Sequence, residues 1–357
     1  MMQKTLTIII LFLTAFRFPS CKNTQVETVD LDPLVRMALY DTTSSYYTDF
    51  STYPRNIADL PIGVFALGAT KTTTLDCALA LDCFDNITGG EQSDRIRDFA
   101  GEHFIYYTAL SDADSIYDAN GRMDIHDAAI KHTLFLVGDK CAEGEKERAK
   151  IILAAGNITR AEGLDDIRLM LSRSGSGVKI LSVVEEGVKG LLDALDKKPL
   201  VNYTVGMIAD SVTIASGAYQ RTFAEVMADR GLKASIPLVC QPLEMTDSLS
   251  TKQLCNALSQ MIESHYAAGK PNPICALIAD FTIDDEQKAA FQDVINNYRS
   301  KRINGDYPYR SAINDRLIYI NPSECAAMEC YRVLRADNNL ALRIGETKVT
   351  HYTDLPM

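Results

Sequence analysis

The nine cysteines are the residues of this sequence with the widest range of possible chemistry, from metal binding to proton transfer by a thiolate. No two of them form a CxxC pair, and neither Cys77/Cys83 nor Cys325/Cys330 has a spacing that zinc sites use. Nine cysteines in 357 residues also fall far short of the ~8–10% that marks a disulfide scaffold. Free cysteines are usually small buried hydrophobic residues. We therefore expect most of them in the core, and no metal site built on them.

A second group of potential ligands lies in an aspartate-rich segment, residues 111–127. Its acidic residues approach the spacing of a calcium loop around Gly121, but Ile116 stands where the first aspartate ligand should be. The nearby His126 and His132 are six residues apart, which is not the i, i+4 spacing that places two ligands on one helical face. We predict a solvated turn into a helix with both histidines at the surface and no metal; calcium binding by the segment is the alternative.

The N-terminus has a pattern typical of export. Residues 5–16 are a short apolar run behind Lys4, too short for an unaided membrane-spanning helix of ~20 residues. Cys21 follows Ser20 as in a bacterial lipoprotein signal, where the cysteine is lipidated and begins the mature chain. We predict a signal peptide at 1–20 and a lipid anchor at Cys21 that holds the protein to the membrane on the periplasmic side of a bacterial cell envelope. A cleaved signal with secretion to the periplasm, or an uncleaved anchor, is the alternative.

Composition and motif content exclude several function classes. Apolar residues make up 46% of the chain and charged residues 23%, which is typical of globular proteins. The net charge of -11 gives no general attraction to nucleic acid, so no nucleic-acid partner is expected. The sequence lacks GxSxG, GxxxxGK[ST], HExxH and GxGxxG motifs, and we expect no cofactor. The oligomeric state stays open.

From residue 60 onward, short apolar runs alternate with amphipathic stretches, which is typical of an α/β protein with parallel sheets. Buried parallel strands are predicted at 62–68, 104–107, 149–156, 178–184, 201–208, 273–278 and 316–320. Helices are predicted at 159–172, 217–230, 284–300 and 323–336. The length of 357 residues suits two domains of doubly wound type.

Several strand ends, in order over residues 60–340, together resemble the glutamate racemases within the aspartate/glutamate racemase superfamily. The matching segments are 62–68, 155–159, 183–188, 205–219, 236–242 and 317–324, of which 205–219 is the most specific. The resemblance implies two pseudo-symmetric doubly wound parallel-sheet domains with a cleft between them. The first domain would comprise 59–182 plus 305–345, and the second 183–304. Residues 21–58 would be an N-terminal leader or tether.

The chemistry of the resembled family needs two cysteines, one to remove the α-proton and one to return a proton on the opposite face. In this sequence the two cysteine positions correspond to Gly156 and Asp280. The aspartate and serine after the opening strand correspond to Ala66 and Leu67, and a histidine near the second cysteine corresponds to Thr282. A glycine transfers no proton, so we predict that two-cysteine racemisation is lost, with Asp280 as the one candidate catalytic residue.

Candidate ligand-binding residues follow from the same resemblance. They are Ala66, Leu67, Tyr117, Asn157, Ile158, Thr213, Ser216, Glu244 and Thr282. Thr213, Ser216 and Tyr219 lie at a predicted helix start, where free N–H groups can accept a carboxylate; capping and turn roles are the alternative for Thr213 and Ser216. Glu185 and Glu186 are predicted to be solvated residues at the domain junction.

Three hypotheses about function result. The first is an exported racemase-like protein that binds a small acidic ligand, an amino acid or a cell-wall fragment, in the interdomain cleft. The second is an active, cofactor-independent amino-acid racemase or isomerase with Asp280 as one base and Tyr117 or Glu244 as its partner. The third is a structural or protein-binding module of the envelope.

Overall fold

The first of two parallel sheets is built from strands far apart in the sequence. The computed structural model describes residues 31–66, 97–108, 125–142, 144–195, 203–232, 236–244, 249–269, 272–279, 281–342 and 345–353. Within these ranges the first sheet has the order β11-β2-β1-β5-β6, and all its neighbours are parallel. The strands are β1 (Ile62–Phe65), β2 (His103–Tyr107), β5 (Ile151–Ala154), β6 (Lys179–Ser182) and β11 (Lys348–Tyr352). β1 and β5 are buried along their whole length, as expected for strands covered on both faces.

The second parallel sheet has the order β10-β9-β7-β8 in the described part of the chain. Its strands are β7 (Thr204–Ala209), β8 (Leu238–Pro242), β9 (Ile274–Ala279) and β10 (Ile313–Ile320). β7 and β9 are fully buried central strands, whereas β8 at the edge is half-buried and ends in a proline, which a central strand would not tolerate.

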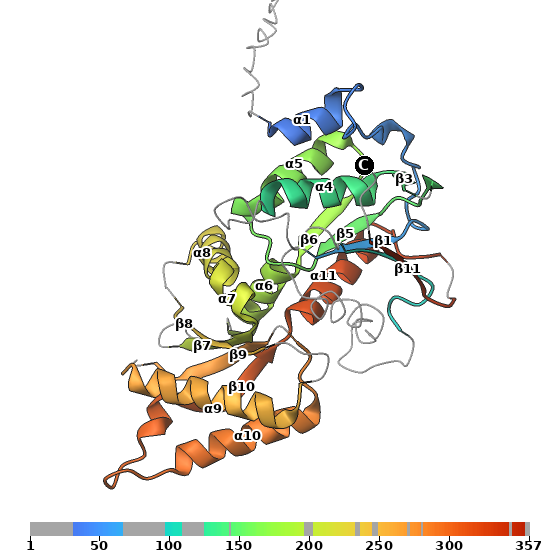
Figure 1. The fold of residues 1–357 in the computed structure, drawn as a ribbon. Helices are drawn as coiled ribbons and strands as arrows, with labels where there is room; N and C mark the ends of the chain where they lie inside the picture. Colours follow the sequence, from blue (N-terminus) through green and yellow to red (C-terminus); the bar gives the residue numbers. More distant parts are fainter. Residues whose placement is uncertain are drawn as a thin grey trace, which may run out of the picture. The chain divides into compact units, whose positions relative to one another are not determined.

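Helices connect and cover the strands (Figure 1). They are α1 (Pro33–Tyr40), α4 (Ile125–Val137), α5 (Leu164–Ser174), α6 (Val183–Leu195), α7 (Ser211–Ser216), α8 (Ala218–Asp229), α9 (Thr251–Ala267), α10 (Asp285–Ser300) and α11 (Pro322–Ala336). Short 3-10 helices lie at Phe50–Thr52, Arg160–Glu162 and Pro308–Ser311, and β3 (Lys140–Cys141) pairs antiparallel with β4 (Gly144–Glu145). The start of α9 is fixed by a capping box of Ser250 and Gln253. None of the helices in the described ranges combines the length and apolar character that crossing a membrane requires.

The last helix joins the two sheets. Ala326, Ala327 and Cys330 of α11 pack into the core of the first sheet, although α11 directly follows β10 of the second sheet. α11 also packs closely against α6. A Cβ atom at Gly190 of α6 would lie only 2.5 Å from the sulfur of Cys325, so this contact requires a glycine. All these elements belong to one unit of the chain, Asp32–Met357.

The predicted fold class, α/β with two parallel sheets, is confirmed, and most predicted strands and helices lie within a few residues of the observed ones. The predicted helix at 159–172 is a 3-10 turn followed by α5, because Gly163 adopts φ 99° between them. β8 and β11 were not predicted as strands. Both are edge strands with exposed or half-buried residues, so neither has a continuous apolar run.

Two predicted boundaries are wrong. The predicted leader reaches residue 58, but Val35 and Ala38 of α1 are buried, as are Phe50 and Ile57, so its part from Asp32 onward belongs to the folded structure. The sequence analysis places 305–345 in the first domain as one piece. β10 pairs with β9, and therefore the strand belongs to the second sheet while the helix after it packs on the first. The predicted signal peptide and Cys21 lie outside the described residues.

Candidate functional site

The turn that follows β5 is where the sequence predicts the centre of the site. Carboxyl ends of parallel strands gather at one edge of a sheet, and ligands usually bind there. The backbone N–H of Ala155 donates to the carbonyl of Phe65 at 2.7 Å, which ties the ends of β5 and β1 together. Gly156 and Asn157 follow, and both are buried.

A buried chain of hydrogen bonds joins this turn to the end of β7 in the other sheet. The side-chain amide of Asn157 donates to the hydroxyl of Thr213 at 3.0 Å. That hydroxyl donates in turn to the carboxylate of Asp210 at 2.7 Å, and Thr213 is only 2% exposed. The structure thus brings two predicted site residues together from two sheets. Asp210 was missed, although an aspartate directly before a helix is a recognisable N-cap signal.

The helix start at Thr213 has a carboxylate partner from the chain itself. The carboxylate of Asp210 accepts from the backbone N–H of Thr213 at 2.8 Å and so caps α7. Ser216 lies at the junction of α7 and α8, where its hydroxyl donates to the carbonyl of Thr213 and accepts from the N–H of Ala218. Tyr219 is buried in the core of the second sheet. The hydrogen bonds of Thr213 and Ser216 within the chain are those expected if these residues have capping and turn roles.

Replacing Thr213 by valine keeps the shape of the side chain and removes its hydroxyl. The amide of Asn157 and one carboxylate oxygen of Asp210 would then lose their partner in a buried place. We expect the free energy of unfolding to fall by about 1–3 kcal/mol, measured by urea denaturation. The matched control is Thr42→Val, at an exposed threonine, which should have an effect below about 0.5 kcal/mol. Equal effects of the two substitutions would contradict a stabilising role of this hydrogen-bond chain.

The remaining predicted site residues are scattered. Ala66 is half-buried against the first core, and Ile158 is fully buried. Glu244 and Thr282 are exposed, and within the described ranges neither forms a hydrogen bond to the Asn157–Thr213–Asp210 chain. Leu67, Tyr117 and Asp280 lie outside the described residues, as does most of the aspartate-rich segment. The ligand-binding roles of all these residues stay predictions.

The described cysteines are free thiols, namely Cys141, Cys240, Cys255, Cys275, Cys325 and Cys330. Cys275 lies near the start of β9 and is buried, as is Cys330, whereas the other four are half-buried. Burial raises the pKa of the Cys325 thiol to about 12, and it also raises the pKa of Cys240 and Cys255. These three thiols are therefore poor sources of the thiolate that proton abstraction needs.

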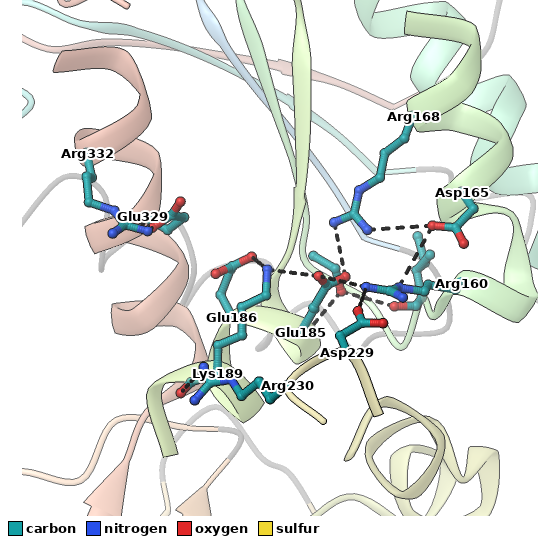
Figure 2. Close-up of polar contacts among 12 residues, drawn as sticks. Arg160, Asp165, Arg168, Glu185, Glu186, Lys189, Asp229, Arg230, Glu329 and Arg332 are labelled. Atoms are coloured by element: carbon teal, nitrogen blue, oxygen red, sulfur yellow. Dashed lines mark hydrogen bonds and ion pairs between the residues drawn. The ribbon is translucent and has the colours of Figure 1, made fainter. Parts of the chain in front are cut away.

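The two glutamates at the start of α6 are buried, which corrects the prediction of solvated side chains. Glu185 is 4% exposed and is surrounded by cations from two helices and the turn after β5 (Figure 2). Its carboxylate lies 3.0 Å from Arg168, 2.8 Å from Lys189 and 4.0 Å from Arg160. Paired acids are usually surface residues, and this is the basis of the prediction. The two arginines lie 17 and 25 positions before Glu185, so local spacing gives no sign that they contact it.

The electrostatics of the two glutamates differ. Burial alone would raise the pKa of Glu185, but the hydrogen bond from Lys189 and the charge of Arg168 outweigh it and hold that pKa below its ordinary value. Among the described residues, the carboxylate of Glu186 accepts a hydrogen bond from Lys189 alone, and burial raises the pKa of Glu186. Glu185 is therefore the ionised centre of a network that holds α5 and α6 together, rather than a free acid for catalysis.

A histidine and two aspartates form the one group found in the described residues that could hold a metal ion: Asp32, His126 and Asp127, whose ligand atoms lie within 4.8 Å of one another. Nδ1 of His126 lies 3.3 Å from Asp127 and 3.9 Å from Asp32, and Nε2 lies 3.0 Å from Asp166.

The predicted surface pair of histidines is wrong. His132 is fully buried, edge-on to the ring of Tyr107 at 4.7 Å, because α4 packs nearly all of its faces.

Among solved structures, the chain is similar to a glutamate racemase from Thermus thermophilus in complex with beta-chloro-D-alanine, with 19% identity, 82% of this chain and 87% of that chain covered, and a TM-score of 0.47. It is similar to a glutamate racemase from Francisella tularensis in complex with D-glutamate, with 19% identity, coverage of 84% and 90%, and a TM-score of 0.45. It is also similar to a solute binding protein of an ABC transporter from Clostridium phytofermentas with bound L-rhamnose, with 13% identity, coverage of 78% and 82%, and a TM-score of 0.28. No protein-family model matches the chain, and no curated protein matches it.

Proposed function

We propose that this chain is an exported, racemase-like protein that binds a small acidic molecule, an amino acid or a cell-wall fragment, where the carboxyl ends of its two sheets meet. We propose further that it does not racemise by the two-cysteine mechanism. The observation that carries the proposal is Gly156, which lies at the carboxyl end of β5 and has no side chain with which to move a proton.

The neighbours of Gly156 support the loss of two-base chemistry. Racemisation by two opposed groups requires a titratable side chain on each face of the substrate. Asn157 beside Gly156 carries an amide, which does not titrate, and that amide already donates to Thr213. Cys275 lies near the start of β9, at the end of the strand opposite to the one where the resemblance places a cysteine.

Binding is supported by position and by chemistry. The Asn157–Thr213–Asp210 chain holds polar groups rigidly at the ends of β5 and β7, which belong to different sheets, and such junctions are common ligand sites in α/β proteins. The choice of an acidic ligand follows from the resemblance of residues 60–340 to the glutamate racemases. Export, with a lipid anchor at Cys21, follows from the pattern of residues 1–21.

Two measurements on the mature chain test this proposal together. Thermal unfolding with L- and D-glutamate, L- and D-aspartate and a glutamate-containing wall peptide should raise the melting temperature for at least one compound. Proton NMR in deuterated water should show no loss of the α-proton signal of these amino acids. Asn157→Ala should abolish the thermal shift, whereas Asn297→Ala, at an exposed asparagine of α10, should retain it.

The outcomes separate the hypotheses. Exchange of the α-proton that disappears in Asp280→Ala would overturn the proposal in favour of an active isomerase with non-cysteine groups. The absence of any thermal shift across the compounds would overturn ligand binding and favour a structural module.

A further inference from the structure

A cavity of about 630 Å³ lies at the other end of β5 from the proposed site. Its lining comes from three places: the segment Ser44–Asp49, the second half of α4 with the turn Gly138–Lys140, and Arg148 shortly before β5. The volume is typical of sites for small molecules, which range from about 300 to 1,000 Å³. Asn157 follows the carboxyl end of β5, whereas this cavity adjoins its amino end, so the two sites are distinct.

Arg148 is the most constrained charge of the cavity. It is 8% exposed, and its guanidinium donates to the backbone carbonyl of Asp49 at 3.1 Å and to the carboxylate of Asp139 at 2.8 Å. It also lies over the ring of Tyr53, at 5.0 Å from the centroid. A guanidinium has five N–H donors, and within the described residues these two bonds leave three of them without an acceptor. A held arginine with spare donors is suited to receive an oxyanion.

Lys131 supplies a second positive charge from α4. It is half-buried and forms no ion pair or hydrogen bond with any residue of the described ranges; its ammonium group lies 6.0 Å from the ring centroid of Tyr46. Leu134 and Phe135, one turn further along α4, give the cavity an apolar wall. A ligand could therefore place a charged group against the cations and an apolar body against this wall.

The acidic residues of the lining are already engaged. Asp139 accepts from Arg148, and the carboxylate of Asp49 accepts from the backbone and hydroxyl of Ser51 at 3.0 and 2.6 Å. One backbone carbonyl at the end of α4 has a partner from outside the cavity lining, because Nζ of Lys146 donates to the carbonyl of Gly138 at 2.6 Å. With Lys140 also in the lining, three cations face two carboxylates, so the formal charge of the lining is positive.

We propose that this cavity binds a small molecule with a carboxylate or phosphate group, held by Arg148 and Lys131, and with an apolar ring against Leu134 and Phe135. The proposal is independent of the function proposed for the carboxyl edge.

Binding of 1-naphthyl phosphate and 1-naphthoate to the mature chain, followed by calorimetry and by naphthyl fluorescence, tests the proposal and distinguishes the two oxyanions. We expect one site per chain, at least tenfold tighter binding of one of these anions than of neutral 1-naphthol, and weaker binding as salt is added. Lys131→Gln should weaken anion binding at least tenfold without changing the melting temperature, because this ammonium makes no ion pair or hydrogen bond in the described part of the protein. Arg148→Lys should also weaken it.

Two controls locate the site. Lys252→Gln, at an exposed lysine of α9, and Asn157→Ala, at the carboxyl edge, should both leave naphthyl phosphate and naphthoate binding unchanged. Equal binding of naphthol and the two anions, or full binding in folded Lys131→Gln, would overturn the proposal. So would loss of binding in Asn157→Ala, since the anions would then occupy the other site.

Discussion

Replacing Lys150 by methionine is expected to lower the free energy of unfolding by about 3–5 kcal/mol, the largest single effect that we predict for this protein. Lys150 and Glu102 are each 2% exposed, and their charged groups lie 2.6 Å apart. The ammonium also donates to the carbonyl of Ala58 at 2.6 Å, and the other oxygen of Glu102 accepts from the N–H of Ala341 at 2.7 Å. One buried ion pair therefore ties four distant segments of the chain together, and methionine would leave the carboxylate buried without its cation.

The effect should depend on pH. Burial raises the pKa of Glu102 even in the presence of Lys150, and removal of the lysine would raise it further. A carboxyl group whose pKa is raised in the folded protein lowers the stability at neutral pH. This loss disappears as the pH falls from the raised, folded pKa toward the ordinary pKa, because both states then bind the proton. The deficit of Lys150→Met should therefore shrink as the pH is lowered from 7 to 5.

Urea denaturation followed by circular dichroism measures this directly. The double variant Lys150→Met/Glu102→Leu removes both charges and should recover a large part of the loss. Lys252→Met, at an exposed lysine, serves as the control and should change stability by less than about 0.5 kcal/mol. A loss below about 1 kcal/mol in Lys150→Met, or a double variant no better than the single one, would contradict the role assigned to this pair.

Glu185→Gln is expected to cost about 2 kcal/mol at neutral pH, because it removes the charge at the centre of the network in Figure 2 without changing the size of the side chain. The estimate is lower than for Lys150, since Arg168 and Lys189 are partly exposed and water screens them. The pKa of Glu185 is held below its ordinary value of 4.5, so its contribution is present above that pH and is lost as the pH falls through the lower, folded pKa. The difference between wild type and variant should accordingly be greatest near pH 7 and shrink below pH 4.5.

Glu186→Gln is the matched control for this prediction. Glu186 is adjacent, equally buried and also bonded to Lys189, but its pKa is raised by burial. The neutral amide should therefore cost less at position 186 than at position 185 when both are measured at pH 7 by urea denaturation. Equal losses, or a loss for Glu185→Gln that does not vary between pH 7 and pH 4, would be evidence against the network.

The parts of the fold that can be predicted are those with a local pattern of apolar residues. Continuous apolar runs identified β1, β5, β7 and β9 because both faces of these strands are covered. The edge strands β8 and β11 have no such run, and their pairing depends on a neighbour that sequence periodicity does not reveal.

The candidate site also has a part that sequence predicts and a part that depends on tertiary structure. Asn157 and Thr213 were selected as site residues from the sequence, but their hydrogen bond to each other depends on how the two sheets come together. The burial of Glu185 depends on arginines from an earlier turn and helix, and His132 is buried because α4 is covered on nearly every face. These features depend on tertiary contacts. Of the contacts around the two glutamates, the i, i+3 and i, i+4 pairs with Lys189 are the ones that sequence spacing alone indicates.

The route of the C-terminal segment has a consequence for biosynthesis. β10 completes the second sheet, α11 returns to the first core, and β11 pairs with the outer edge of β2. Since the ribosome releases the chain from its N-terminus, the edge of β2 stays unpaired until residues 348–352 have emerged. The outer edge of the first sheet can therefore be completed only after residues 348–352 have left the ribosome, well after its other four strands, which all lie before residue 183.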